Sequence, residues 1–207
     1  MKESCIIFGG AGFIGSHIAE DLLKNGIRVT VFDKLNASKK NVQHILNEID
    51  FIEGDFNNEV DISKALKGKD NVVHLVSSTV PATSNLNTFY DVESNLISSL
   101  HLFEKCAEYK TKRLIFISSG GTVYGNPIKL PVSEKHPTDP TSSYGIIKLT
   151  IEKYLHLYKV LKGLDYKILR FANPYGERQN PLLTQGLIAH LLYKIKKGET
   201  LEVWGDG

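Results

Sequence analysis

Hydrophobic and polar positions alternate along this chain with two different periods, one typical of strands and one typical of helices. Short β-branched or aromatic runs predict strands at residues 4–8, 28–32, 50–53, 71–76, 113–117 and 166–169. Helical spacing predicts helices at residues 13–24, 88–109, 143–161 and 187–197. The run at 71–76 is uncharged and rich in valine, which favours a strand that is buried on both faces of a parallel sheet.

The regular alternation of strands and helices predicts an α/β fold. Right-handed βαβ units would build a doubly wound parallel sheet with helices on both faces. In such sheets, ligands bind beyond the carboxyl ends of the strands, so the residues that follow each strand are the candidate site. These residues are 9–12, 33, 54–55, 77–79, 118–124 and 171–176.

A glycine-rich loop, GGAGFIGS (9–16), follows the first strand, and its Gly9, Gly12 and Gly15 form a GxxGxxG spacing. Such glycines permit a tight turn and let backbone N–H groups approach a pyrophosphate at the helix N-terminus. Asp33 lies 18 residues after Gly15, close to the offset of about 20 for an acid that accepts a hydrogen bond from a ribose 2′-OH. An ordinary βα turn is the alternative, but the order of strand, loop, helix and acid favours a Rossmann-type dinucleotide site.

The acid at position 33 also favours NAD over NADP, because a carboxylate repels a 2′-phosphate. Lys34 and the Lys39-Lys40 pair weaken this preference, since they would attract the same phosphate. The sequence therefore predicts NAD as the cofactor.

Tyr144 and Lys148 form a YxxxK pair that projects from one face of a predicted helix. The lysine, together with a cationic nicotinamide, is expected to lower the pKa of the phenol from about 10 toward neutrality. Tyr144 could then exchange a proton with a substrate hydroxyl. The same spacing recurs deeper in two predicted helices, at Tyr158 with Lys162 and at Tyr193 with Lys197. Only Tyr144 starts a helix directly after a strand and its loop.

Composition excludes several other classes of function. The formal net charge of +2 gives no electrostatic case for nucleic acid or an anionic membrane as a partner. No apolar run is long enough to span a bilayer, and the N-terminus turns glycine-rich too early for a signal peptide. Cys5 and Cys106 form no CxxC pair, so we expect two buried thiols in a reducing cytoplasm. The seven histidines show no metal-ligand spacing, so no metal site is expected.

Together these features resemble the extended short-chain dehydrogenase/reductase family, in its NAD-dependent sugar epimerase/dehydratase branch. The matching segments run in family order over nearly the whole chain: GGAGFIGS (9–16), Asp33, Gly54-Asp55, HLVSST (74–79), Asn95, SSGGTVYG (118–125), YGIIK (144–148) and RFANPYGERQ (170–179). The resemblance implies an NAD-binding Rossmann domain over residues 1–170, including the Tyr/Lys helix, and part of a substrate-binding lobe over 171–207. Because the family continues further, a fragment or a natural short form is expected.

The resemblance also implies roles for individual residues. The expected cofactor contacts are Gly9, Gly12, Phe13, Ile14, Gly15, Asp33, Asp55, Phe56, Leu75, Val76, Asn95, Tyr144 and Lys148. Among them, Asp55 with Phe56 would meet the adenine, Leu75 and Val76 would line the pyrophosphate, and Asn95 would anchor a cofactor loop. The expected substrate contacts are Thr79, Ser119 and Asn173, the last at the diphosphate of a nucleotide sugar. Taken singly, Asp55, Asn95 and Asn173 could equally be turn or helix-surface residues.

The reaction implied by the resemblance is an oxidation followed by a reduction. Tyr144 would take the proton from the sugar C4 hydroxyl while the nicotinamide takes the hydride, and the keto-sugar would turn over before the hydride returns. Dehydratases and decarboxylases of the family carry acids just before the valine of this loop, where this chain has Gly120, Gly121 and Thr122. The resemblance therefore favours 4-epimerisation of a UDP-hexose over elimination.

The sequence alone leaves three points open. Gly120 stands where most such epimerases have their catalytic Ser or Thr; Ser119, slightly preferred, and Thr122 are the nearest substitutes, unless both only hydrogen-bond the loop. The function could instead be that of a reductase or synthase of the same family, or of a non-catalytic NAD-binding module. A homodimer is expected through helices 88–109 and 143–161, by way of Leu96, Leu100, Phe103, Ile151, Leu155 and Leu157, unless these residues face their own sheet.

Overall fold

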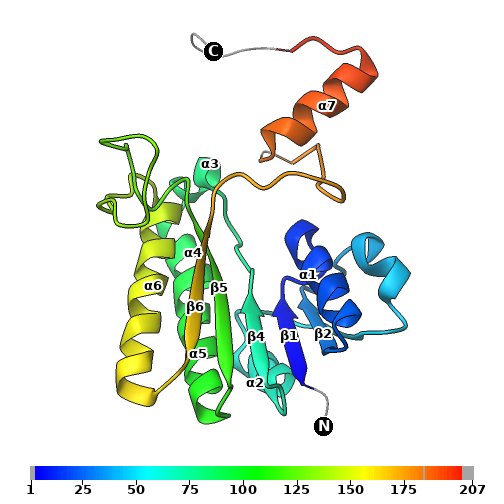
Figure 1. The fold of residues 1–207 in the computed structure, drawn as a ribbon, viewed down its shortest axis with the longest axis vertical. Coiled ribbons are helices and arrows are strands. Elements are labelled where there is room, and N and C mark those ends of the chain that lie inside the picture. The colour runs from blue at the N-terminus through cyan, green and yellow to red at the C-terminus, as the bar shows by residue number, and fades with distance from the viewer. Residues whose placement is uncertain (1–2, 184, 202–207) are drawn as a thin grey trace. The chain divides into compact units, whose positions relative to one another are not determined.

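The computed structural model describes residues 3–183 and 185–201, and the chain divides into two compact units, residues 1–172 and 173–207. The first unit contains a six-stranded sheet whose neighbouring strands all pair in parallel, in the order β3-β2-β1-β4-β5-β6 (Figure 1). The strands are β1 (Ser4–Phe8), β2 (Arg28–Asp33), β3 (Asp50–Glu53), β4 (Asn71–His74), β5 (Arg113–Ser119) and β6 (Tyr166–Phe171). This arrangement confirms the predicted doubly wound parallel sheet.

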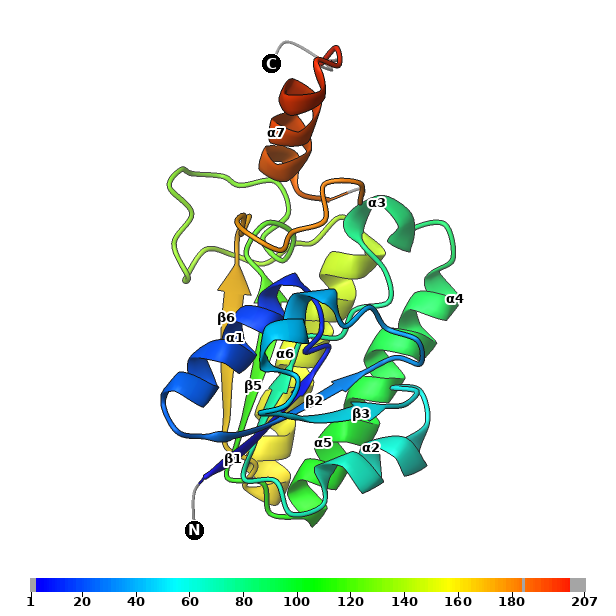
Figure 2. The same cartoon turned by 90° about the vertical axis from the view of Figure 1, so that its right-hand side faces the viewer.

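Helices cover both faces of the sheet (Figures 1 and 2). One face carries α1 (Phe13–Lys24) and the 3₁₀-helix η1 (Lys40–Ile45), and the other carries α2 (Glu59–Leu66), α5 (Ser98–Glu108) and α6 (Ser143–Lys162). Strand β1 shows how the sequence fills both layers. Its side chains point alternately to the two faces, so that Ile6 and Phe8 join the core under α5 and α6 while Cys5 and Ile7 join the core under α1.

The predicted helix 88–109 is wrong as a single regular helix. It consists of α4 (Thr88–Asp91), a π-helical segment η2 (Val92–Ile97) and α5. A π-turn contains one more residue than an α-turn, so it rotates the side chains that follow it relative to those before it. The sequence patterns also left η1, α2 and the single turn α3 (Pro81–Ser84) unpredicted, because these helices are too short for a clear hydrophobic period.

Strand ends differ from the prediction at four places. β2 ends at Asp33, one residue later than predicted. β4 ends at His74, two residues earlier than predicted, whereas β5 and β6 run on and stay paired as far as Ser119 and Phe171. The predicted domain boundary at residue 170 therefore falls inside β6, and the two units divide after Ala172.

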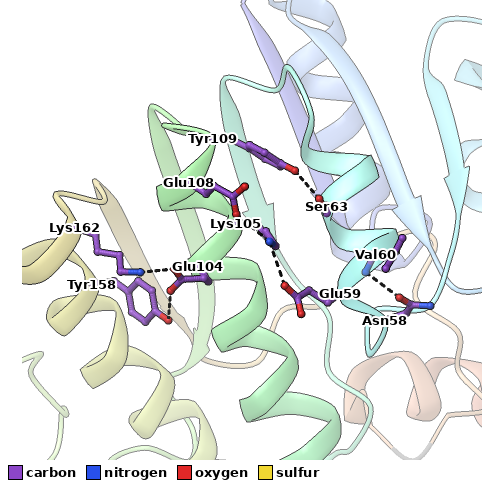
Figure 3. Close-up of polar contacts among 10 residues, drawn as sticks. All are labelled: Asn58, Glu59, Val60, Ser63, Glu104, Lys105, Glu108, Tyr109, Tyr158 and Lys162. Carbon is purple, nitrogen blue, oxygen red and sulfur yellow. Dashed lines mark hydrogen bonds and ion pairs between the residues drawn. The ribbon is translucent and has the colours of Figure 1, made fainter.

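Polar contacts join the outer layer of helices α2, α5 and α6 (Figure 3). Lys105 of α5 forms an ion pair with Glu59 of α2 at 3.2 Å. Glu104 of α5 pairs with Lys162 and accepts a hydrogen bond from the Tyr158 hydroxyl at 3.2 Å, both from α6. Exposed pairs of this kind add little to stability, so the buried layers against the sheet are what hold these helices.

Both cysteines are buried and unpaired, as predicted. Burial raises the pKa of Cys5 and of Cys106 to about 12. Neither thiol is therefore a reactive nucleophile, and both serve as small apolar side chains of the core.

The second unit contains α7 (Leu187–Lys197), whose bounds agree with the sequence prediction. Four apolar side chains of this helix are exposed: Leu187, Ile188, Leu192 and Ile195. Neither α7 nor any other helix within 3–183 and 185–201 has the length and apolar character needed to cross a membrane.

Candidate active site

The order of the strands places a ligand crevice between β1 and β4. Chain order runs outward in opposite directions from these two strands, and ligands of such sheets bind at this switch point. Leu75 and Val76, directly after β4, lie against the glycine loop after β1. A Cβ atom built on Gly9 would be 3.4 Å from Leu75 Cβ and 3.4 Å from Val76 N. Both residues are therefore beside the loop that was predicted to hold the pyrophosphate.

The glycine loop packs on α1 with no space for a side chain at Gly15. A Cβ atom there would lie 2.5 Å from the Gly9 carbonyl oxygen and 2.6 Å from Gly10 Cα. The first N–H groups of a helix have no partner within the helix, and Gly12 supplies no side-chain cap to α1. The N–H groups at Phe13, Ile14 and Gly15 thus fit an anionic group such as the pyrophosphate of NAD.

Replacing Gly15 by alanine is expected to weaken NAD binding by about tenfold or more, because the added methyl group pushes the loop away from α1. Titration calorimetry measures the affinity, and a thermal unfolding curve shows whether the fold is kept. Gly121→Ala is the matched control, since a Cβ atom there meets nothing within 4 Å. A folded Gly15→Ala protein that binds NAD like the parent would contradict this account of the loop.

Asp33 ends β2 and is held against the glycine loop. Its carboxylate accepts hydrogen bonds from the N–H of Ala11 at 3.0 Å and from the N–H of Lys34 at 2.9 Å. Lys39, which was expected to weaken the preference for NAD, forms an ion pair with Glu53 at 3.3 Å. The acid is thus placed at the rim of the crevice, and at least one of the nearby lysines is engaged elsewhere.

Asp55 and Phe56 follow β3 but differ in what they offer a ligand. Asp55 is exposed, and its carboxylate accepts a hydrogen bond from the N–H of Asn57 at 2.8 Å. The Phe56 ring is buried, with its centroid 5.6 Å from that of Phe8 and 5.0 Å from that of His74. A contact of Phe56 with the cofactor would therefore use its backbone rather than its ring.

The structure brings Tyr144 and Lys148 together in the first turns of α6. Lys148 is 5% exposed, and its Nζ lies 5.5 Å from the centroid of the Tyr144 ring. The same Nζ donates a hydrogen bond to the carbonyl oxygen of Ile117 at 3.1 Å and lies 4.9 Å from the Phe116 ring centroid. β5 thus fixes the ammonium group beneath the tyrosine.

In the protein without NAD, the pKa of Tyr144 lies above its usual value rather than below it. Burial raises the pKa of Tyr144, and the Asp91 carboxylate raises it further. Burial lowers the pKa of Lys148 to about 8, although Asp91 acts in the opposite direction. The sequence analysis considered Lys148 and the nicotinamide, and neither burial nor the buried carboxylate of Asp91. The lowering of the Tyr144 pKa by a bound nicotinamide stays a prediction.

Asn95, which the resemblance implied as the anchor of a cofactor loop, anchors the loop after β4. Its side-chain oxygen accepts a hydrogen bond from the N–H of Ser78 at 2.9 Å, and its amide donates to the Ser78 hydroxyl and to Asp91, each at 2.8 Å. Thr79 of this loop was expected to contact substrate. Its hydroxyl is buried and donates to Asp91 at 2.5 Å, and the substrate contact stays a prediction.

A second buried carboxylate, Glu152, lies two turns beyond Tyr144 on α6. It accepts hydrogen bonds from the Ser118 hydroxyl at 2.5 Å and from the Arg170 guanidinium at 3.0 and 2.6 Å. Arg170 also donates to the Tyr124 hydroxyl at 2.8 Å. The sequence analysis did not identify Glu152, although its spacing of four residues after Lys148 places both on one helix face.

The loop after β5 shows why position 120 carries no hydroxyl. A Cβ atom on Gly120 would lie 2.9 Å from the Arg170 carbonyl oxygen, so β6 leaves no space for a side chain. Thr122 packs against the first turn of α6, 3.2 Å from a Cβ atom built on Gly145. Its Oγ1 is buried and has no hydrogen-bond partner among residues 3–183 and 185–201. Ser119 ends β5 and is partly buried, and Asn173 begins the second unit.

Comparison with known proteins identifies the family of this chain. The model of the NAD dependent epimerase/dehydratase family matches residues 5–207. A putative UDP-glucose 4-epimerase of Methanocaldococcus jannaschii is 37% identical over 204 residues, which cover 98% of this chain and 66% of that protein. Among solved structures, the UDP-glucose 4-epimerase of Thermotoga maritima with UDP-glucose is 35% identical with a TM-score of 0.92, covering 99% of this chain and 66% of that one.

A further structure, the UDP-glucose 4-epimerase of Thermus thermophilus in complex with NAD, is 34% identical with a TM-score of 0.88 and covers 96% of this chain and 64% of that one. The chain thus spans about two thirds of the length of these proteins. The family match and the NAD-bound structure support NAD as the cofactor, as the sequence predicted. Because the matched residues and the fold agree, the chain is a member of the NAD dependent epimerase/dehydratase family.

Proposed function

We propose that this chain carries the cofactor-binding and catalytic part of a nucleotide-sugar 4-epimerase that acts on a UDP-hexose. The observation that carries the proposal is the Tyr144–Lys148 pair in the first turns of α6, on the helix that packs against β5, together with the absence of a carboxylate at positions 120–122. The names of the similar proteins, which include UDP-glucose 4-epimerases, support the same substrate class.

The residues of this chain would move the proton of the reacting hydroxyl. NAD, when bound, supplies a hydride acceptor and donor and a cationic ring that lowers the pKa of a neighbouring phenol. Tyr144 takes the proton from the sugar hydroxyl and later returns it, as a general base and then a general acid. Lys148, largely protonated at neutral pH with a pKa of about 8, stabilises the phenolate form.

Elimination of water is disfavoured by the side chains before Val123. Such a reaction needs a base for the proton at C5 and an acid for the leaving hydroxyl. Gly121 has space for a side chain, since a Cβ atom there meets nothing within 4 Å, and Thr122 carries a hydroxyl. Because neither position supplies a carboxyl group, we infer that this loop serves proton transfer to Tyr144 rather than elimination.

We propose that the hydroxyl of Thr122 takes the role of the catalytic Ser or Thr that is missing at Gly120. It is buried beside the first turn of α6 and lacks a partner within the described ranges, whereas nothing comparable singles out Ser119. Thr122→Val keeps the shape of the side chain and removes the hydroxyl, and it is expected to lower kcat about a hundredfold. Ser119→Ala is the matched comparison and should leave kcat near the parent value. The reverse ranking of the two variants would assign the role to Ser119.

We also propose a homodimer, through a surface that keeps only Leu157 of the residues first expected. Phe103, Ile151 and Leu155 are buried in the core of their own sheet, and Leu96 and Leu100 pack against that core. Several other apolar side chains of the same helices are exposed instead: Phe89, Ile97, Leu157, Val160 and Leu161. Covering this surface with a second copy would remove it from water, and sedimentation velocity will show whether the protein is a dimer.

The test of the proposed function is turnover of a UDP-sugar without added NAD or NADPH. The full-length gene product is incubated with UDP-glucose or UDP-N-acetylglucosamine, and the 4-epimer is measured by chromatography. Formation of the epimer supports the proposal. Product that appears only with stoichiometric NADPH indicates a reductase or synthase, and nucleotide binding with no product indicates a non-catalytic module.

A further inference from the structure

The side chain of Asp91, at the end of α4, is almost completely buried and is bound from three separate segments. Asp91 is 1% exposed. Its Oδ1 accepts hydrogen bonds from Thr79 Oγ1 at 2.5 Å and from Asn95 Nδ2 at 2.8 Å, and its Oδ2 accepts one from Ser143 Oγ at 2.6 Å. One carboxylate therefore ties the loop after β4 and the π-helical segment to the residue directly before Tyr144.

The residues just before Asp91 hold the backbone of the same turn of α6. The side-chain oxygen of Asn85 accepts a hydrogen bond from the N–H of Ser143 at 2.8 Å, and the buried Ser84 hydroxyl accepts one from the N–H of Tyr144 at 3.1 Å. These N–H groups belong to the helix start and have no partner within α6. The segment from Ser84 to Asp91 thus positions Tyr144 from outside its own helix.

The irregular backbone occurs next to this carboxylate. The π-helical segment η2 begins at Val92, directly after Asp91, and ends before α5. Single π-turns are rare in proteins, and those that occur are frequently found at functional sites. Asp91 and Asn95 lie four residues apart at this segment, where they bind each other and the loop after β4.

Asp91 also supplies charge to the catalytic pair. Among the described residues, the carboxylate that acts on Lys148 is Asp91 from α4. Lys148 in turn acts on His74 from β4, and its Nζ lies 5.5 Å from the ring centroid of Tyr144. Burial and the Lys148 charge lower the pKa of His74 to about 3, so that this imidazole is neutral. Glu152, one turn further along α6, is paired with Arg170. Asp91 is therefore the negative charge that influences both Tyr144 and Lys148.

We propose that Asp91 is a positioning residue of the catalytic pair, which anchors Tyr144 through Ser143 and provides the counter-charge that keeps Lys148 protonated in its buried site. The inference rests on the proposed function in treating Tyr144 and Lys148 as the catalytic pair. The effect of the Asp91 charge on the ionisation of Tyr144 and Lys148 is a property of the protein itself, so it can be measured without a substrate.

The experiment compares Asp91→Asn, Ser143→Ala and the exposed-site control Asp21→Asn with the parent protein. The full-length gene product is labelled at the tyrosine ring Cζ with ¹³C, and the Tyr144 signal, identified by its absence from Tyr144→Phe, is followed by NMR against pH. Asp91→Asn keeps the size of the side chain and removes its charge, so the Tyr144 titration should move to lower pH. Ser143→Ala keeps the charge, so its Tyr144 titration should stay near that of the parent, as should that of Asp21→Asn.

Turnover of UDP-glucose is the second measurement. Ser143→Ala releases the anchor and should lower kcat by about ten- to a hundredfold with little change in KM. The alkaline limb of the kcat profile should move to lower pH in Asp91→Asn, because Lys148 then loses its proton more readily.

An unchanged Tyr144 titration in a folded Asp91→Asn protein overturns the proposal. If Asp91→Asn does not fold, the test rests on Ser143→Ala. A parent-like kcat in Ser143→Ala then overturns the proposal equally. If the parent protein shows no turnover while the Tyr144 titration shifts as expected, the proposed function fails and the electrostatic role of Asp91 stands.

Discussion

Tyr144→Phe is expected to lower kcat for epimerisation by about 10²- to 10⁴-fold, the range attributed to general acid–base catalysis. The substitution removes the oxygen that takes and returns the proton and leaves the ring on α6. Because Asp91 binds through Ser143 and the backbone N–H at position 144 is unchanged, the helix start should keep its structure. The measurements are kcat with UDP-glucose and the affinity for NAD, and the affinity should change little.

Tyr158→Phe is the matched control, because Tyr158 has the same spacing to a lysine on the same helix. Its hydroxyl donates to Glu104 on the outer surface, away from the sheet (Figure 3). This variant should turn over like the parent. If Tyr144→Phe kept a parent-like kcat, or if Tyr158→Phe lost as much activity, the assignment of the general base to Tyr144 would be wrong.

Glu152→Ala is expected to destabilise the fold by about 3–5 kcal/mol, the cost of removing one partner from a buried ion pair. Glu152 is 6% exposed and accepts both guanidinium bonds of Arg170 as well as the Ser118 hydroxyl. Its removal leaves a largely buried arginine and a buried hydroxyl without that partner. The free energy of unfolding is measured by urea denaturation, with the slope checked for two-state behaviour.

Glu104→Ala is the control for this prediction, because it removes a glutamate from an exposed ion pair with Lys162 (Figure 3). Exposed pairs contribute about 0.2–1 kcal/mol, so the control should differ from Glu152→Ala by several-fold in its effect. Equal losses in the two variants would mean that the contacts among α6, β5 and β6 at Glu152 contribute no more than a surface pair does.

The sequence was sufficient for the fold where one hydrophobic period runs through a whole element. The helices at 13–24 and 187–197 and the strands at 4–8 and 50–53 have the bounds that the sequence predicted. Prediction failed where the period is short or broken. Helix α2 has too few turns for a period to show, and the π-helical segment after Asp91 inserts a residue that no propensity marks.

The candidate-site residues that the sequence identifies are those set by their position in a loop or helix. Residues that join the site through contacts with distant parts of the chain were harder to predict. Gly15, Tyr144 and Lys148 follow from loop and helix positions. Asp91 was missed because its partners, Thr79 and Ser143, are distant in the sequence. The same long-range packing explains the engagement of Thr79 with Asp91 and the raised pKa of Tyr144. It also explains why five of the six residues first expected at a dimer interface pack into their own core, with Leu157 exposed.

The proposed reaction inverts C4 of a UDP-hexose by transferring a hydride from that carbon to NAD and back to the same carbon. The direct measurement uses UDP-glucose deuterated at C4 and the full-length gene product, without added NAD or NADPH. The product is analysed by mass spectrometry and NMR. The account predicts UDP-galactose that retains deuterium at C4. Product that has exchanged its C4 deuterium for solvent hydrogen, or deuterium found in released NADH with no epimer formed, would contradict it.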